Sequence, residues 1–188
     1  MNDNVFLACP PKWHDYQGKE CLTTSSFFHD KLKTSNSNDA CRNIRYSSLA
    51  SMETKDKVDF TRAFLPVGNS GINRYFRISL VEYPGECSWV WSHTTGWYWT
   101  APPTDASEIF WMRGNPDDAR GAGVCGDRNP RRPGEHCGSL FDRRGRNGIN
   151  DIGCSAVFPY VCQGKRGKQI TYVAIFDILS VYRCVASL

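Results

Sequence analysis

The chain has 188 residues, a net charge of +4 and nine cysteines. This length suggests a single domain with a sizeable core, and the small net charge does not by itself indicate a nucleic-acid partner. Nine cysteines are too many for a cytosolic chain without a cofactor, and no Cys-x-x-Cys pair of the kind found in zinc ribbons and thioredoxin-like redox sites occurs. Disulfides in an oxidising compartment explain them better, so we expect a secreted, extracellular protein.

The N-terminus gives no independent sign of secretion. Residues 1–8 contain neither a basic nor an apolar stretch and do not form a signal peptide. We interpret them as the remnant of a leader, or as the result of a late start. Between Cys9 and Cys21, two prolines favour an extended segment and Gly18 favours a turn, which together predict a short stapled hairpin.

A helix and a short strand are predicted next. Asn38 and Asp39 are of the types that cap helix N-termini, so one of them is expected to begin the first helix, which carries Cys41. Residues 48–52 then read as a short strand.

A second helix is predicted over residues 53–65, where apolar side chains recur at helical spacing until Pro66 ends the pattern. After a turn, residues 75–83 alternate between two kinds of side chain, which predicts a half-buried strand. The apolar set comprises Phe76, Ile78 and Leu80, against Arg77, Ser79 and Val81.

From Pro84 to Gly153, glycine, proline and charged residues dominate, interrupted by islands of tryptophan. A segment this long with little regular structure is usually either functional or disordered. The tryptophans and the flanking cysteines favour a structured loop region. A strand over residues 157–163 is expected to close the domain, which gives it boundaries of 9–163.

Five oxygen-bearing side chains occur in this loop region, close to tryptophan and cysteine residues. All five are hard donors of the kind that Ca²⁺ prefers, and three are acidic, enough to offset a divalent cation. They are Asn115, Asp117, Glu135, Asn150 and Asp151.

The order of these motifs resembles the long form of the C-type lectin-like domain, from residue 9 to about residue 163. The resemblance rests on Cys9-Pro with Cys21, Asn38-Asp-Ala-Cys41, Gly134-Glu-x-Cys137, Asn150-Asp-x-x-Cys154 and Tyr160-Val-Cys162. It implies an α+β fold with two helices, two small antiparallel sheets and a long loop region pinned by disulfides. The disulfides it implies are Cys9–Cys21, Cys41–Cys162 and Cys137–Cys154.

The sequence departs from the family's pattern in three places. Arg77-Ile-Ser-Leu stands where the family has Trp-Ile-Gly-Leu, so a core tryptophan is missing. Ile149 replaces the tryptophan of Trp-Asn-Asp, while both oxygen ligands of that motif remain. An insertion over residues 118–134 separates Asp117 from Glu135.

The resemblance implies that the five oxygen-bearing side chains bind Ca²⁺, with a cis bond before Pro116. It also implies that Asn115, Asp117, Glu135 and Asn150 contact carbohydrate. The protein would then be a calcium-dependent glycan-binding lectin, with innate-immune recognition as one role. A domain that has lost its metal, or a calcium-independent protein-binding member of the fold, are the alternatives. No nucleophile elbow, metal-binding His pair or P-loop suggests an enzyme.

The sugar class is less well defined. Asn115-Pro116-Asp117 has its amide first and its acid last, which resembles the galactose-type rather than the mannose-type family motif. Family members that bind galactose place an aromatic residue soon afterwards, and residues 119–123 offer none. Trp97, Tyr98 and Trp99 are candidates for this stacking role, with a place in the loop core as the alternative.

Several arginines lie near the proposed site in sequence. Guanidinium groups pair well with sulfate and carboxylate, so anionic glycans are one plausible ligand class, and a solvated loop is the alternative. The arginines are Arg128, Arg131, Arg132, Arg143, Arg144 and Arg146.

Three cysteines and the C-terminal tail remain. Cys87 and Cys125 are candidates to pair with each other, and Cys184 is then free or available for an interchain bridge in an oligomer. In the tail, residues 164–188, a short linker precedes an apolar stretch that contains Asp177 and Arg183. Each charge costs about 2.5–3.5 kcal/mol in a bilayer, so a membrane span is not expected and the role of the tail stays open.

Overall fold

The structure of the protein is a computed structural model. It describes residues 8–25, 32, 34–44, 47–66, 75–82, 89–92, 109–117, 134–143 and 146–166. Cys87, Cys125, Cys184, Trp97, Tyr98 and Trp99, and most of the tail, lie outside these residues. The predictions that concern them therefore stay predictions.

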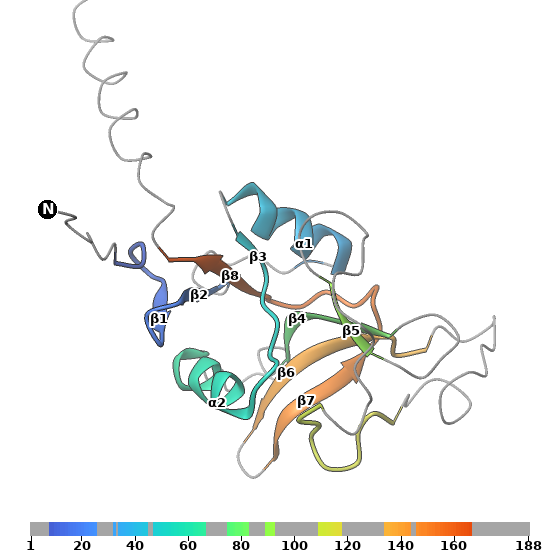
Figure 1. Ribbon diagram of the computed structural model, residues 1–188. Coiled ribbons are helices and arrows are strands. Elements are labelled where there is room, and N and C mark those ends of the chain that lie inside the picture. The colour runs from blue at the N-terminus through green and yellow to red at the C-terminus, as the bar shows by residue number, and fades with distance from the viewer. Residues whose placement is uncertain are drawn as a thin grey trace, which may run out of the picture.

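The first sheet brings the two ends of the described chain together. Its strand order is β1-β2-β8-β3, and every neighbouring pair is antiparallel. Figure 1 shows β2, from the N-terminal end of the chain, beside β8 from its C-terminal end. The strands are β1 (His14–Tyr16), β2 (Glu20–Thr24), β3 (Ser47–Leu49) and β8 (Val161–Lys165).

The second sheet carries most of the central part of the chain. Its order is β5-β4-β6-β7, again antiparallel throughout, and β6 and β7 form a hairpin. The strands are β4 (Tyr75–Glu82), β5 (Trp89–Trp91), β6 (Cys137–Arg143) and β7 (Arg146–Ile152). The α+β fold with two antiparallel sheets that the sequence predicts is confirmed.

The described residues form two helices, α1 (Thr34–Asn43) and α2 (Lys55–Phe64), which lie on opposite sides of β2 and β8 in Figure 1. Thr54 caps α2, because its hydroxyl oxygen accepts the N–H of Lys57 at 3.2 Å. The helix ends where Leu65 turns to an extended conformation ahead of Pro66.

One apolar cluster joins the two sheets and α2. Leu22 and Val161 of the first sheet lie in the same cluster as Ile78, Leu80 and Leu140 of the second sheet. All five side chains are fully buried. Burial of aliphatic side chains contributes roughly 1.5–3 kcal/mol each, so this shared core fixes the position of one sheet against the other.

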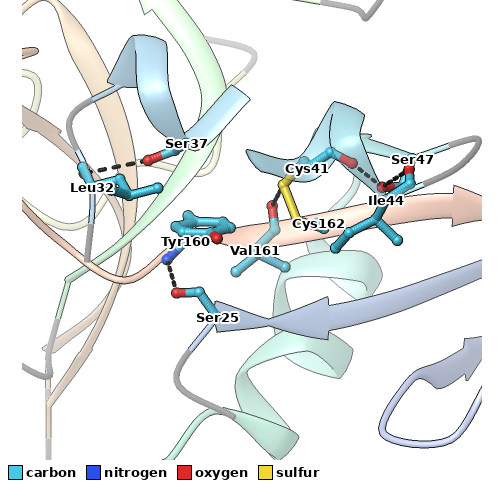
Figure 2. The surroundings of a disulfide bond; sticks show 9 residues. All are labelled: Ser25, Leu32, Ser37, Cys41, Ile44, Ser47, Tyr160, Val161 and Cys162. Atoms are coloured by element: carbon cyan, nitrogen blue, oxygen red, sulfur yellow. Dashed lines mark hydrogen bonds between the residues drawn. A yellow bond between two sulfur atoms is a disulfide. The ribbon is translucent and has the colours of Figure 1, made fainter. Parts of the chain in front are cut away.

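A second cluster surrounds the disulfide between Cys41 of α1 and Cys162 of β8 (Figure 2). Leu49 and Tyr160 complete its buried part. The backbones of Ser25 and Tyr160 are joined at 2.9 Å, and the N–H of Tyr160 also donates to the Ser25 hydroxyl at 2.9 Å. Both backbone polar groups of Tyr160 are therefore satisfied by Ser25.

The described residues contain three disulfides, and they join the pairs that the resemblance implies. Cys9–Cys21 staples the β1–β2 hairpin, and Cys41–Cys162 closes the domain across 121 residues. Cys137–Cys154 connects the start of β6 to the segment after β7, across 17 residues. No helix among the described residues is long and apolar enough to cross a membrane.

Several predicted elements differ from the structure, and the second helix is slightly shorter than the predicted 53–65, at Lys55–Phe64. The first helix begins at Thr34 rather than at Asn38 or Asp39. Its polar N-terminal turn has no apolar periodicity to mark it, and Ser37 and Cys41, one turn apart, are both fully buried. The strand predicted over 48–52 is β3, at Ser47–Leu49.

The closing strand is Val161–Lys165 rather than 157–163, so Gly164 and Lys165 belong to the sheet and not to a linker. The region from Pro84 to Gly153, read as mainly loop, contains β5, β6 and β7. Its glycines had suggested irregular structure. Two of them are needed within the strands. A Cβ at Gly138 would lie 2.6 Å from Leu80, and Gly148 has φ +142°, which favours glycine.

The strand at 75–82 is buried on both faces, which contradicts the predicted half-buried alternation. Arg77 and Ser79 are as completely buried as Ile78. The reason is that α1, β3 and β8 pack against β4, and that the Arg77 guanidinium lies at the carbonyls of Gly153 and Ala156. Segments of the chain beyond the second sheet therefore cover β4.

Candidate metal centre

The segment 109–117 lies against the outer edge of β7. The N–H of Met112 donates to the carbonyl of Ile149 at 2.7 Å, and the N–H of Ile149 donates to the carbonyl of Phe110 at 3.0 Å. Gly148 makes this approach possible, because a Cβ there would lie 2.8 Å from the nitrogen of Met112. These two hydrogen bonds hold the segment against β7 and so position the residues that follow Met112, up to Asp117.

A tight turn then directs the chain back toward β7. The N–H of Asn115 donates to the carbonyl of Met112 at 3.0 Å, and Gly114 has φ +93°, a region that favours glycine. The Asn115–Pro116 peptide bond is cis. Asn115 and Asp117 consequently lie beside Asn150 and Asp151 at the end of β7.

Hydrogen bonds connect these four residues. The Asn115 amide nitrogen donates to the Oδ1 atoms of Asn150 and, at 2.7 Å, Asp151. The N–H of Asp117 donates to the Asp151 Oδ2 at 3.0 Å, and the Asn150 amide donates to the carbonyl of Asp151. Asp151 is only 1% exposed, and both of its carboxylate oxygens accept hydrogen bonds, as a buried carboxylate requires.

Glu135 reaches the same place from the segment before β6. The N–H of Glu82 donates to the carbonyl of His136 at 2.9 Å, and the His136 ring forms a second link to the Glu82 carboxylate. Cys137 pairs with Ile152 in the sheet and with Cys154 through a disulfide. Glu135 is thus held at the end of β6 that lies next to the end of β7.

Three carboxylates meet at this point. Carboxylate oxygens of Asp117, Glu135 and Asp151 all lie within 4.8 Å of one another. Asp117 is exposed, Glu135 half-buried and Asp151 buried, so the cluster extends from the surface inward. The five predicted residues, which are spread over 37 positions of the sequence, thus lie together as one group, here called the oxygen cluster.

The chemistry of the oxygen cluster fits Ca²⁺. Its donors are carboxylate and amide oxygens, with the carbonyl of Asp151 nearby, and Ca²⁺ takes six to eight such oxygens. One donor points differently: the nitrogen of the Asn115 amide, rather than its oxygen, faces Asp151. Asn115 would serve as a ligand through its Oδ1 after its amide turns.

The sequence did not indicate two side chains that support the oxygen cluster, Arg77 and His136. The Arg77 guanidinium donates to the carbonyls of Ala156 at 2.6 Å and Gly153 at 3.4 Å, in the segment after β7. Burial lowers the pKa of Arg77 to about 10, so it stays protonated at neutral pH. The one signal was an arginine inside an apolar strand pattern.

The arginines expected near the site are only partly described. Arg128, Arg131, Arg132 and Arg144 lie outside the described residues. The backbones of Arg143 and Arg146 are paired at the β6–β7 turn, at the opposite end of this hairpin from the Cys137–Ile152 pair. Six residues of strand at about 3.3 Å each place their backbone roughly 20 Å from that end. Their backbone positions are therefore not those of arginines next to the oxygen cluster.

Sequence comparison identifies the family. A family model for the lectin C-type domain matches residues 30–164, which is most of the chain. The chain belongs to the C-type lectin domain family. Domains of this family are non-enzymatic carbohydrate-binding modules, in agreement with the expectation that the chain is not an enzyme. No curated protein matches the chain significantly in sequence.

Solved structures show the same fold. The C-type lectin domain of murine dendritic cell inhibitory receptor 2, in complex with N-glycan, has a TM-score of 0.61 and 21% identity, covering 85% of this chain and 100% of that chain. Human lithostathine has a TM-score of 0.61 and 19% identity, covering 85% and 92%.

A third structure is the C-type carbohydrate-recognition domain of cow CD23, determined in the presence of a GlcNAc2Man3 oligosaccharide. It has a TM-score of 0.56 and 23% identity, covering 85% of this chain and 97% of that chain. At these identities the likeness concerns the fold, and the ligand of this chain has to be argued from its own residues.

Proposed function

We propose that this C-type lectin domain binds carbohydrate through a calcium ion held by the oxygen cluster. The observation that carries the proposal is the meeting of Asp117, Glu135 and Asp151, whose carboxylate oxygens lie within 4.8 Å of one another. Like charges this close raise each other's energy, and a divalent cation among them removes that cost. The neutral oxygens of Asn115 and Asn150 complete a donor set suited to Ca²⁺.

The role of carbohydrate in this proposal follows from the geometry of the donors. The oxygen cluster extends from buried Asp151 to exposed Asp117, so an ion within it would keep a side toward solvent. Ca²⁺ commonly completes its coordination with water or another oxygen ligand. Two neighbouring hydroxyls of a sugar are such ligands, and in this proposal the same hydroxyls would hydrogen-bond to Asn115, Asp117, Glu135 and Asn150.

Galactose-type sugars are the sugar class we propose. The amide of Asn115 precedes the acid of Asp117, an order that resembles the galactose-type family motif rather than the mannose-type one. Anionic glycans are a weaker proposal, since the described arginines Arg143 and Arg146 belong to the far end of the β6–β7 hairpin.

An extracellular setting is proposed on the cysteines. Cys9–Cys21, Cys41–Cys162 and Cys137–Cys154 are all formed, and such bonds persist in oxidising compartments. Recognition of glycans on other cells or microbes, as in innate immunity, is the process that such a domain would serve.

The melting temperature of the oxidised chain, measured with calcium and with chelator, tests the proposal. A ligand at 100 times its Kd stabilises the folded state by about 2.7 kcal/mol. For a domain of this size that corresponds to a rise in Tm of roughly 5–10 °C. Asp117→Asn and Glu135→Gln should each reduce the rise, and a glycan array should show binding only with calcium.

Asp39→Asn is the matched control, because Asp39 is an exposed acid on α1 outside the oxygen cluster. Its calcium-induced rise in Tm should equal that of the unmodified chain. No rise at millimolar calcium would reject the calcium site, and an equal rise in Asp117→Asn and Glu135→Gln would place the ion elsewhere.

A second candidate function is calcium-independent recognition of a protein partner. The observation that favours it is that both carboxylate oxygens of Asp151 already accept hydrogen bonds, from the Asn115 amide and the N–H of Asp117. The cluster thus holds its shape through its own contacts. Calcium-insensitive Tm together with calcium-insensitive binding to a cell surface would select this function.

A further inference from the structure

A groove opens beside the oxygen cluster. It has a volume of about 320 Å³, at the lower end of the roughly 300–1,000 Å³ of small-molecule pockets. Glu135 and Asn150 line it, and both belong to the oxygen cluster. Tyr75 and Phe158 also line it, so the same groove joins polar donors to two aromatic rings.

The strand register gives the groove its direction. Cys137, two residues after Glu135, pairs with Ile152 at one end of β6. Tyr75 pairs with Phe141 near the other end of the same strand. The groove therefore runs along the sheet, away from the oxygen cluster and toward the aromatic rings.

The wall of the groove is the segment between β7 and β8, and it is fixed at several points. The buried Arg77 donates to the carbonyls of Gly153 and Ala156. Cys154, between these two residues in the sequence, is held to Cys137 by a disulfide. Farther along, the backbone of Phe158 exchanges two hydrogen bonds with that of Leu32, at 3.0 and 3.3 Å. A wall held in this way is pre-organised, so little ordering is needed when a ligand binds.

Ring contacts likewise fix the aromatic side chains at the far end of the groove. The rings of Tyr75 and Phe158 are 5.2 Å apart, and Tyr75 also contacts Phe141 at 4.8 Å. The Arg77 guanidinium lies 5.9 Å from the centre of the Phe158 ring. Tyr75 and Phe158 nevertheless remain half-exposed, so part of their apolar surface faces the groove.

We propose that this groove is an extended subsite, which holds the second sugar unit of an oligosaccharide whose terminal unit lies on the oxygen cluster. This inference rests on the proposed function. The apolar C–H face of a pyranose ring suits the rings of Tyr75 and Phe158. The Ser155 hydroxyl, which lines the same groove and is not part of the oxygen cluster, suits its hydroxyl groups, and this favours a sugar over an acyl chain.

Calorimetric titration of the full oxidised chain in calcium tests the subsite. The probes are two monosaccharides, methyl galactoside and methyl mannoside, and the disaccharides lactose and mannobiose that carry the same terminal sugars. One disaccharide should bind about tenfold more tightly than its matching monosaccharide, as expected for a sugar unit packed on an aromatic ring. Phe158→Ala should reduce this ratio toward one.

Val157→Ala is the control, because Val157 precedes Phe158 in the same segment but is exposed and does not line the groove. Its ratio should match that of the unmodified chain. Ser155→Leu provides a second variant should Phe158→Ala not fold, because Ser155 is exposed and a larger side chain there occupies the groove. It should likewise lower the disaccharide ratio.

The outcomes separate the subsite from the function on which it depends. Equal binding of each disaccharide and its monosaccharide, or a tenfold ratio that survives both Phe158→Ala and Ser155→Leu, overturns the subsite alone. Failure of all four saccharides to bind in calcium overturns the subsite together with the proposed carbohydrate function.

Discussion

The surroundings of the Cys41–Cys162 disulfide and the oxygen cluster satisfy their buried groups in opposite ways. Around the disulfide, the N–H of Tyr160 donates to the Ser25 hydroxyl (Figure 2). Leu49 and Tyr160 are buried there, in a cluster of largely apolar side chains. In the oxygen cluster, three carboxylates lie within 4.8 Å of one another. The first arrangement stabilises the fold, whereas the second concentrates charge that a cation would relieve, at some expense of stability.

The largest expected effect is a loss of stability on removal of the Cys41–Cys162 disulfide. Cys41→Ala/Cys162→Ala should lower the free energy of unfolding by about 5 kcal/mol, because it reopens a loop of 121 residues in the unfolded chain. Cys137→Ala/Cys154→Ala reopens only 17 residues and should cost about 3 kcal/mol. Urea unfolding of the two variants measures the difference.

The same pair of variants separates the two regions by their response to calcium. Loss of Cys137–Cys154 should also weaken calcium stabilisation, since Cys137 follows Glu135 by two residues and Cys154 follows Asp151 by three. Loss of Cys41–Cys162 should leave the calcium-induced rise in Tm unchanged in the fraction of the protein that remains folded. Identical calcium responses would show that the two regions are not separable.

A somewhat smaller effect is expected at Arg77, which connects the wall of the groove to β4. Arg77→Ala should lower the free energy of unfolding by about 3 kcal/mol, because it leaves a cavity and removes the donor to the carbonyls of Gly153 and Ala156. Arg62→Ala, at a surface ion pair with Asp59, should cost less than about 1 kcal/mol. Comparable losses in the two variants would contradict the role given to Arg77.

Arg77 also shows where prediction from the sequence stops. The helix at 55–64 and the strand at 75–82 were predictable because apolar periodicity and a terminating proline are local signals. Burial of Arg77 was not, since it depends on Gly153 and Ala156, more than 70 residues away, supplying acceptors. The local alternation placed its side chain on a solvent-facing side of the strand.

The oxygen cluster shows the same division. The types of its five residues were informative, because carboxylate and amide oxygens on loops are suited to Ca²⁺. Their meeting depends on Gly148, where the absence of a Cβ lets the chain at Met112 approach β7. That function of a glycine within a strand has no local sequence signal, and glycines of this kind made β6 and β7 look like loops.

A smaller change in stability is expected for Asp117→Asn, with one sign in the presence of chelator and the opposite sign in the presence of calcium. With chelator, Asp117→Asn should raise the free energy of unfolding slightly, by no more than about 1 kcal/mol, because one of three neighbouring charges is removed at the exposed end of the cluster. With calcium, the same variant should be less stable than the unmodified chain. Melting curves in both conditions give the two signs, and a loss of stability in chelator would contradict the repulsion argument.

The smallest expected effect is a pH dependence in the first sheet. The His14 ring stacks on Phe64 at 4.0 Å, and burial lowers the pKa of His14 from its ordinary 6.5. The unfolded chain therefore takes up this proton at a higher pH than the folded chain does. Stability from this source is complete above pH 6.5 and declines as the pH falls through 6.5 toward the lower folded value.

His14→Phe isolates this contribution, because phenylalanine keeps the stack on Phe64 without a titrating group. The difference in Tm between His14→Phe and the unmodified chain should widen as the pH falls from 7.5 to 5.5 by roughly a few degrees at most. It should do so equally with calcium and with chelator, since β1 lies in the first sheet and the oxygen cluster at the edge of the second. If the contribution of His14 to stability changed with calcium, the first sheet and the oxygen cluster would be energetically coupled.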